Sequence, residues 1–212
     1  MKPENRKLLE TFLRQSNAAA DVNGCIDTFN IYIDELLRWN NVVNLTAIEE
    51  ESEVVIKHFI DSLTPLRFIR DRDFILDIGS GAGFPGLPIK IARPSVRLVM
   101  LDARFKKINF LNRVIHLLEL SGTTALHQRA EQKHFQNIMG ASFDVVISRA
   151  SFSLPELFDL SLPYLKKGGR LIAMKARETE AYDAAAGLKQ ADELITSLPD
   201  GSFRRILVFK KV

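Results

Sequence analysis

The sequence predicts an α/β protein with a mostly parallel, doubly wound sheet, an antiparallel C-terminal strand and a helical N-terminal region. Two observations favour this fold class. Up to residue 70, apolar residues recur only at helical spacing, whereas strand-like and helical runs alternate from residue 74 onwards. In addition, one buried strand-like run breaks into a glycine-rich turn, which is typical of ligand sites in open α/β sheets. We therefore expect a helical region over residues 1–70, packed on a sheet domain over residues 71–212.

The N-terminal region contains three predicted helices. The longest has an apolar stripe formed by Ile26, Phe29, Ile33, Leu36 and Leu37. A shorter helix precedes it at residues 8–13, and another follows at residues 54–63 with Ser52 as its N-cap.

The sheet domain consists of alternating predicted strands and helices. Strand-like runs occupy residues 74–78, 97–101, 123–127, 143–148, 169–174 and 204–210, and helical runs occupy 86–92, 104–119, 152–164 and 179–196. Right-handed crossovers between such strands leave few possible topologies. The last strand has no helix after it and is predicted to lie antiparallel. Gly168 is predicted to be the left-handed C-cap of the helix before the fifth strand.

The glycine-rich turn follows the predicted strand Phe74-Ile-Leu-Asp-Ile78. Gly79, Gly81 and Gly83 allow a tight turn and close approach of the backbone to a ligand. Two patterns fit: residues 81–86 match the dinucleotide fingerprint, and residues 77–83 match the acidic glycine loop of S-adenosylmethionine (SAM) methyltransferases. A pyrophosphate needs free N–H groups at the start of the next helix, and Pro85 and Pro88 remove two of them. The sequence therefore favours SAM.

Further candidate residues lie where the other predicted strands end. Asp102 is placed to accept the ribose hydroxyls of an adenosine cofactor, and it could also cap the following helix. Ala130 and Glu131 follow the third strand, where an adenine would lie. Arg149 ends the fourth strand, and because a buried arginine needs an anion, its partner is a SAM carboxylate, a phosphate, Asp77 or Glu131. Lys175, at the end of the fifth strand, is a candidate substrate contact.

Composition limits the remaining functions. Residues 71–212 hold 21 Lys and Arg against 15 Asp and Glu, whereas residues 1–70 hold 8 against 11. The sheet domain therefore suits an anionic partner such as RNA, and a solvated basic face explains the same charge equally well. Cys25 is the only cysteine and no two histidines have ligand spacing, so we predict no metal site. His58 is predicted to be hydrogen-bonded at a contact between a helix and the sheet domain. The apolar runs are too short for a membrane span, and we expect a cytoplasmic protein.

Four sequence stretches together resemble the bacterial 16S rRNA (guanine-N7) methyltransferase family, RsmG or GidB. They are Trp39-Asn-x-x-x-Asn44-Leu-Thr, His58-x-x-Asp61-Ser-Leu, Asp77-Ile-Gly-Ser-Gly-Ala-Gly-Phe-Pro-Gly86 and Ile147-Ser-Arg-Ala150. The resemblance implies a Rossmann-like class I SAM-dependent fold. It also implies SAM contacts at Gly79, Phe84, Ala130, Glu131 and Arg149.

The implied activity is methylation of N7 of a guanosine in 16S rRNA, with SAM as cofactor. The implied partner is 16S rRNA within the small ribosomal subunit or an assembly intermediate, and the protein is expected to be a monomer that contacts no membrane. Two alternatives stay open on the residues alone. A nicotinamide oxidoreductase would bind NAD through the same glycines, and a non-catalytic RNA-binding protein would keep the basic face without turnover.

Overall fold

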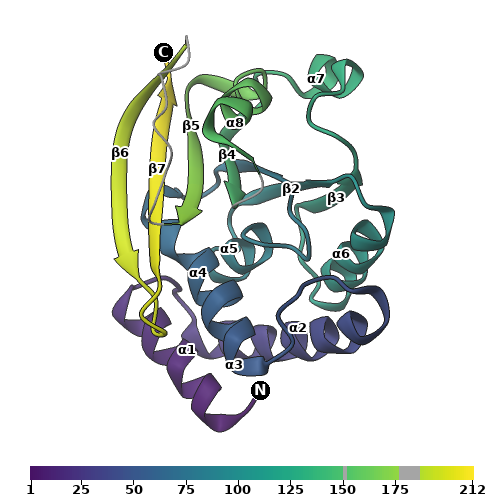
Figure 1. Cartoon of the computed structure of the whole chain (residues 1–212), viewed down its shortest axis with the longest axis vertical. Coiled ribbons are helices and arrows are strands. Elements are labelled where there is room, and N and C mark those ends of the chain that lie inside the picture. The colour runs from purple at the N-terminus through teal and green to yellow at the C-terminus, as the bar shows by residue number, and fades with distance from the viewer. Residues whose placement is uncertain (150–151, 177–186) are drawn as a thin grey trace.

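Seven strands form one sheet in the computed structural model, which describes residues 1–149, 152–176 and 187–212 (Figure 1). The strands are β1 (Phe74–Ile78), β2 (Arg97–Asp102), β3 (Thr123–His127), β4 (Phe143–Arg149), β5 (Leu165–Ala176), β6 (Leu188–Ser197) and β7 (Phe203–Lys211). Their order across the sheet is β3-β2-β1-β4-β5-β7-β6. Strands β1 to β5 pair in parallel, and β7 pairs antiparallel with both β5 and β6. The predicted fold class is confirmed.

Helices precede the sheet and connect its strands. The first 70 residues form α1 (Pro3–Gln15), α2 (Val22–Val43) and a helical run made of α3 (Glu51–Val54), the π-helical η1 (Val55–Ile60), α4 (Asp61–Leu63) and the 3-10 helix η2 (Thr64–Phe68). The connecting helices are α5 (Gly86–Ala92), α6 (Phe105–Leu117), α7 (Lys133–Met139) and α8 (Leu154–Ser161). None of the helices in the described ranges is long and apolar enough to cross a membrane.

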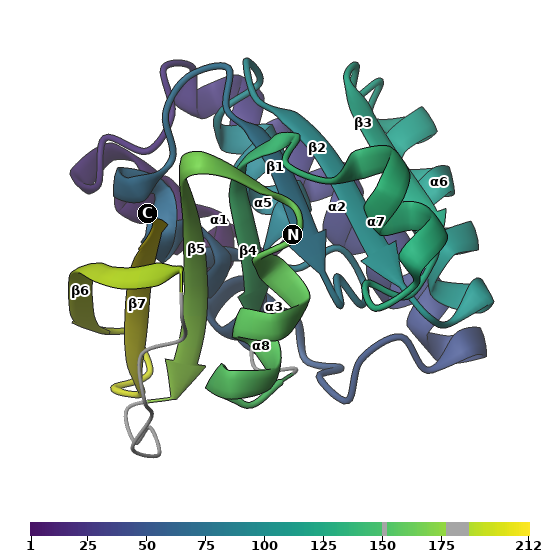
Figure 2. The same ribbon diagram turned by 90° about the horizontal axis from the view of Figure 1, so that it is seen from above.

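The two faces of the sheet are covered by different helices because alternate strand residues point to opposite sides. Ile75 and Val145 pack in one core cluster together with residues of α1, α2, η1, α5 and α6. Leu76 and Val146 pack on the other face, with residues of α7 and α8. Figures 1 and 2 show β6 and β7 at one edge of the sheet and β3 with α6 at the opposite edge. The sheet is therefore the middle of three layers, and the N-terminal helices share a core with it.

The hairpin of β6 and β7 corrects one predicted element. We predict a helix over residues 179–196, but Leu188–Ser197 is strand β6, and residues 179–186 lie outside the described residues. Most of β6 is exposed, so it shows no apolar alternation, and its Lys, Gln, Ala and Glu residues favour helices. Its strand conformation depends on antiparallel pairing with β7, which local composition does not encode.

Two predicted helix ends are also wrong. Helix α3 begins at Glu51 with Glu50 as its N-cap, so Ser52 lies inside the helix and does not cap it. Gly168 has the predicted left-handed backbone, with φ of 76°, but α8 ends at Ser161. Gly168 therefore lies within the first half of β5 and is no helix C-cap.

Candidate active site

The glycine-rich turn joins β1 to α5 and is fixed to the end of β2. The N–H groups of Gly79 and Ser80 both donate to the carbonyl of Leu101, at 2.9 and 3.0 Å. Gly83 has φ of 102°, and a Cβ there would lie 2.4 Å from Leu87 Cδ1 and 2.7 Å from Tyr32 Oη. Only glycine fits this position, because a side chain would be strained and would also clash. The turn therefore lies tightly packed at the carboxyl ends of β1 and β2.

The start of α5 offers little to a pyrophosphate. Asp77 Oδ2 accepts the Gly86 N–H at 2.9 Å, and the Leu87 N–H donates to the Gly83 carbonyl at 2.8 Å. Pro85 and Pro88 have no N–H to donate. Because the N–H groups of this first turn are used internally or missing, the geometry disfavours a dinucleotide and agrees with SAM, which carries no phosphate.

Asp77 is fully buried beneath this turn. Its Oδ1 atom has no hydrogen-bond partner within the described part of the chain. Burial raises the pKa of this carboxyl group to about 7, and the Gly86 hydrogen bond opposes that shift. Asp77 lines neither of the cavities at this end of the sheet, so its carboxylate supports the turn from the protein interior.

A cavity of about 560 Å³ opens beside the turn, at the carboxyl ends of β1, β2 and β3. Gly79, Asp102, Ala130 and Glu131 all line it, so the structure brings together these four predicted cofactor residues. Asp102 accepts from the N–H of Gly81 at 3.0 Å and from that of Arg104 at 2.8 Å. The Asp102 carboxylate is therefore fixed at the lip of the cavity by the backbone on both sides.

The far wall of this cavity is formed by the segment after β3. The Ala130 carbonyl accepts the Tyr164 hydroxyl at 2.6 Å, which anchors the segment to the sheet. The Glu131 carboxylate is 57% exposed and lies 3.5 Å from Arg129. Leu101, Phe152 and Leu160 add apolar surface to the cavity wall. The lining therefore combines an apolar patch with carboxylates and cationic side chains, and the apolar patch and the carboxylates suit an adenosine group.

Phe84 and Arg149 lie on the other side of the glycine turn, facing the N-terminal helices. Phe84 is buried and stacks on His58 with 4.3 Å between the ring centroids. The Arg149 guanidinium carbon lies 5.1 Å from the Phe84 ring centroid. Neither residue lines the 560 Å³ cavity. The structure thus divides the predicted cofactor residues between the two sides of the turn.

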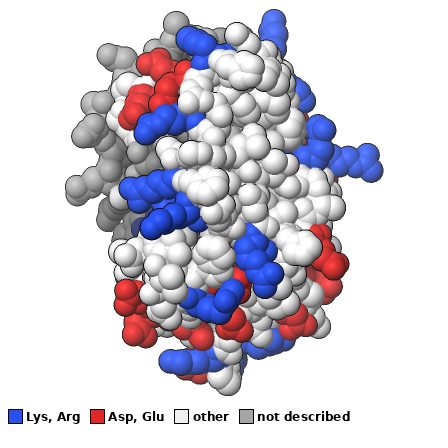
Figure 3. All heavy atoms as spheres, turned by 90° about the vertical axis from the view of Figure 1, so that its right-hand side faces the viewer, with Lys and Arg blue, Asp and Glu red and all other residues white. Residues whose placement is uncertain are grey.

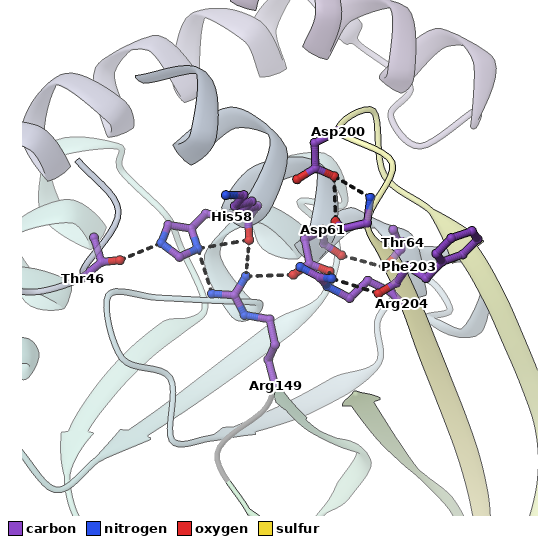
Figure 4. A network of polar contacts seen from close by, with 10 residues as sticks. Thr46, His58, Asp61, Thr64, Arg149, Asp200, Phe203 and Arg204 are labelled. Carbon is purple, nitrogen blue, oxygen red and sulfur yellow. Dashed lines mark hydrogen bonds and ion pairs between the residues drawn. The ribbon is translucent and has the colours of Figure 1, made fainter. Parts of the chain in front are cut away.

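Arg149 is the centre of a buried polar network (Figure 4). It donates through Nη1 to Asp61 Oδ2 at 3.2 Å and to the Lys57 carbonyl at 2.8 Å, and through Nη2 to His58 Nδ1 at 3.0 Å. The other Asp61 oxygen accepts from Arg204 Nε at 3.0 Å. Among the described residues, Asp61 is thus an anionic partner of Arg149, and it was not among the partners that the sequence suggested.

His58 is held neutral within this network. Because a guanidinium group can only donate, His58 Nδ1 must accept, and Nε2 carries the proton and donates to Thr46 Oγ1 at 2.8 Å. Burial and the nearby Arg149 charge lower the pKa of His58 to about 3. His58 is thus hydrogen-bonded at the contact between η1 and the sheet, as predicted, and it is not available as a general base.

The His58 shift predicts a pH-dependent contribution to stability. Between pH 6.5 and 3 the unfolded histidine binds a proton that the folded one excludes, so folding loses about 1.4 kcal/mol per pH unit as the pH falls. We expect the stability difference between wild type and His58→Gln to shrink by that slope on acidification, measured by urea unfolding at several pH values. The exposed His134→Gln variant is the control. A difference that stays constant with pH would contradict this assignment.

A second cavity, of about 450 Å³, lies at the carboxyl ends of β4 and β5. Its lining includes Ile48, Lys57, Asp61, Arg149, Met174, Lys175, Ala176 and Arg204. The Lys175 ammonium group donates to the backbone carbonyl of Phe152. Phe152 is one of the residues that line the first cavity. Lys175 therefore lines the second cavity and is hydrogen-bonded to a residue of the first, and its contact with a substrate stays a prediction.

The sequence did not assign roles to Asp61, Thr46 and Arg204. Asp61 lies three residues after His58 on the same helical run. Because residues at this spacing share a helix face, the sequence could have predicted that both lie in one site. Arg204 reaches Asp61 across 143 positions of sequence, and no local pattern indicates that contact. In the described ranges, no group of three His, Cys, Asp or Glu side chains is arranged to hold a metal ion.

The sheet order, the glycine turn and the carboxylate at the end of β2 define a class I SAM-dependent methyltransferase. Solved structures agree on the fold. The chain is similar to a SAM-dependent methyltransferase from Aquifex aeolicus, with a TM-score of 0.59 and 14% identity over 80% of this chain and 97% of that one. It is also similar to TrmN from Thermus thermophilus, with a TM-score of 0.56 and 19% identity over 72% of this chain and 48% of that one.

Sequence comparisons give the family. The family described as GidB, rRNA small subunit methyltransferase G, matches residues 25–198. Proteins named ribosomal RNA small subunit methyltransferase G are similar too: that of Lachnoclostridium phytofermentans is 43% identical over 88% of this chain and 81% of its own length. That of Geobacter sp. strain M21 is 45% identical over 72% of this chain and 69% of its own length. The chain belongs to the rRNA small subunit methyltransferase G family, so the predicted family, enzyme class and SAM cofactor are confirmed.

Proposed function

We propose that this protein transfers the methyl group of SAM to N7 of a guanosine in 16S rRNA. The observation that supports this most directly is the second cavity at the carboxyl ends of β4 and β5, whose lining holds four cationic side chains against one acid, Asp61. The cationic residues are Lys57, Arg149, Lys175 and Arg204. Cationic side chains around an acceptor cavity suit a nucleotide, which carries a phosphate on each side. The rRNA substrate implies action in the cytoplasm, on the small subunit or an assembly intermediate, and we propose a monomer.

The residues present fit SAM. Asp102 would accept the ribose hydroxyls, and Gly79, Ala130 and Glu131 would flank the adenosine in the first cavity. Asp77 would support this site indirectly, by holding the glycine turn through the Gly86 N–H. When bound, SAM supplies an electrophilic methyl group on a sulfonium. Phe84 and Arg149 would close the site from the side of the N-terminal helices.

The reaction needs no general base from the protein. Guanine N7 is an acceptor with a free lone pair on the major-groove edge of the base. His58 would in any case be unsuitable, because both its ring nitrogens are engaged and it is buried. Catalysis would then rest on holding the nucleophile in line with the methyl group. Since the transfer moves positive charge from the sulfonium to the base, Asp61 would also limit repulsion by neutralising Arg149 nearby.

The N-terminal helices contribute to this proposed site. We propose that residues 1–70 form a helical region that packs on a SAM-binding domain over residues 71–212. Support comes from the core that Phe29 and Phe59 share with β1 and from the Thr46–His58–Arg149 contacts across it. On this proposal the helical region supplies one wall of the acceptor cavity through Ile48, Lys57 and Asp61.

Lys175→Ala tests the acceptor side of the site. We expect it to lower the rate of methyl transfer to RNA about tenfold, because a charged contact to the substrate is worth about 1.5 kcal/mol. SAM affinity should change less than twofold. Single-turnover transfer from labelled SAM and calorimetric SAM titration measure the two quantities. Lys166→Ala, at the opposite end of β5 and paired with Asp144, is the matched control. An equal loss of SAM affinity would place Lys175 on the cofactor.

The activity itself is tested by incubating the protein with labelled SAM and unmodified small ribosomal subunits, then digesting the RNA to nucleosides. Label in 7-methylguanosine is the expected result. Label in another nucleoside would keep the enzyme class and reject the acceptor atom. Naked 16S rRNA in parallel reactions shows whether the assembled subunit is needed, and an absence of label in both substrates would reject the proposal.

A further inference from the structure

A buried glutamate holds two arginines side by side between α2 and α6. Glu35 accepts from Arg38 Nε and Nη2 at 3.1 and 2.7 Å, and from Arg113 Nε at 3.0 Å. Trp39 Nε1 donates to the same carboxylate at 2.9 Å. The hydrogen bonds from Arg38 lower the pKa of Glu35, so its carboxylate is ionised. With one anion and two cations, the cluster keeps a net charge of +1.

The two guanidinium groups face solvent although the glutamate is buried. The Glu35 side chain is 8% exposed, whereas those of Arg38 and Arg113 are 65% and 45% exposed. Within the described ranges, Arg38 Nη1 and both Nη atoms of Arg113 have no hydrogen-bond partner in the protein. The cluster thus presents free N–H donors from two guanidinium groups whose inner edges are already fixed. Such a pair is preorganised for an anion, since binding costs less side-chain entropy.

The same surface continues along α6 towards the adenosine cavity. Lys106, Asn109 and Arg113 recur at helical spacing on its exposed face, and residues 105–118 contain no acid. Lys106 lies about 10 Å from Arg113 along the helix axis. At the start of α6, Arg104 and Lys107 line the cavity itself. Figure 3, which shows the side of the molecule that bears α6, has Lys and Arg side chains on its middle part and acids mostly at its margins.

We infer that the exposed face of α6, together with Arg38 of α2, binds phosphate groups of the RNA strand next to the methylated nucleotide. This inference rests on the proposed function and adds the surface that holds the substrate outside the active site. Planar guanidinium groups favour phosphates because two N–H groups can bind one phosphate in parallel. A row of cations about 10 Å long that ends at the cofactor cavity suits an extended strand better than a single small anion.

The test compares RNA binding of Arg113→Gln, Lys106→Gln and wild type. Arg113→Gln leaves Glu35 paired with Arg38, so the buried carboxylate keeps its cation. The control is Arg14→Gln, which removes an arginine of similar exposure on α1, where it pairs with Glu10. The probes are a fluorescein-labelled single-stranded 12-nucleotide RNA of mixed sequence and an unmodified 16S rRNA transcript. Binding is measured by anisotropy and filter retention from 50 to 300 mM salt, with SAM affinity and melting temperature as checks on folding.

Each α6 variant should weaken RNA binding about fivefold at 0.1 M salt and lower the slope of log K against log salt by about 0.7. SAM affinity should stay unchanged. RNA affinities equal to that of Arg14→Gln would overturn the inference. If wild type methylates RNA while the variants bind and react like it, only this surface is refuted. If wild type methylates neither RNA nor subunits, the proposed function fails instead.

Discussion

Replacing Asp61 by alanine should lower the free energy of unfolding by about 3–5 kcal/mol, the cost of removing one partner from a buried ion pair. Asp61 is 3% exposed and accepts from Arg149 and Arg204, which are themselves 16% and 22% exposed. Burial raises the pKa of Asp61, although both guanidinium groups oppose the shift. The carboxylate is therefore costly to bury, and its removal takes from both Arg149 and Arg204 the ion pair that each makes with Asp61.

Urea unfolding of purified variants measures this effect. Asp61→Asn keeps the size of the side chain and one acceptor oxygen but removes the charge. It should therefore lower the free energy of unfolding, by less than Asp61→Ala does. Asp27→Ala removes the partner of Arg6 in a pair that is 67% and 40% exposed, and this control should cost under about 1 kcal/mol. If Asp61→Ala and Asp27→Ala were equally stable, the network would be a solvated surface feature and not a support of the site.

This network also shows where sequence reasoning ends. A buried arginine at the end of β4 requires an anion, and that requirement could be predicted from Arg149 alone. Its partner could not, because Asp61 lies 88 positions earlier and is brought close only when the N-terminal helices pack on the sheet. His58 was predicted to be hydrogen-bonded at that contact, but its neutral state follows from its burial and from the Arg149 donor, which only the structure shows.

The lining of the 560 Å³ cavity was more predictable. In a parallel sheet the carboxyl ends of neighbouring strands lie at one edge, so Gly79, Asp102 and Ala130 could be grouped by finding where strands end. Phe84 does not lie at the end of a strand, so only the family resemblance predicted it as a site residue. The exposed edge strand β6 was misread as helix because its side chains do not alternate between core and solvent. Alternation of apolar and polar residues predicts a strand when one of its faces is buried. An exposed edge strand such as β6 forms through backbone pairing with its neighbour, which requires no such alternation.

Asp102→Ala should weaken SAM binding about 100-fold. A carboxylate that accepts both ribose hydroxyls contributes about 3 kcal/mol through two charge-assisted hydrogen bonds, which corresponds to two orders of magnitude in affinity. The same carboxylate accepts from the N–H groups of Gly81 and Arg104, so its loss would also loosen the glycine turn against the start of α6. Isothermal titration with SAM and with S-adenosylhomocysteine measures the effect.

Two control variants separate the contribution of Asp102 to the ribose contacts from its contribution to holding the glycine turn. Asp102→Asn retains one acceptor oxygen of similar shape, so it should hold part of the turn while losing the charge that strengthens the ribose contacts. Asp71→Ala removes an exposed acid before the amino end of β1, whereas Asp102 lies at the carboxyl end of β2, so this variant should leave SAM affinity unchanged. Adenosine carries the same ribose hydroxyls as SAM but has no methionine part. If Asp102→Ala weakened the binding of SAM but not that of adenosine, the ribose assignment would be contradicted. Equal losses for both would place Asp102 on the ribose, and the cofactor would then be anchored at the end of β2.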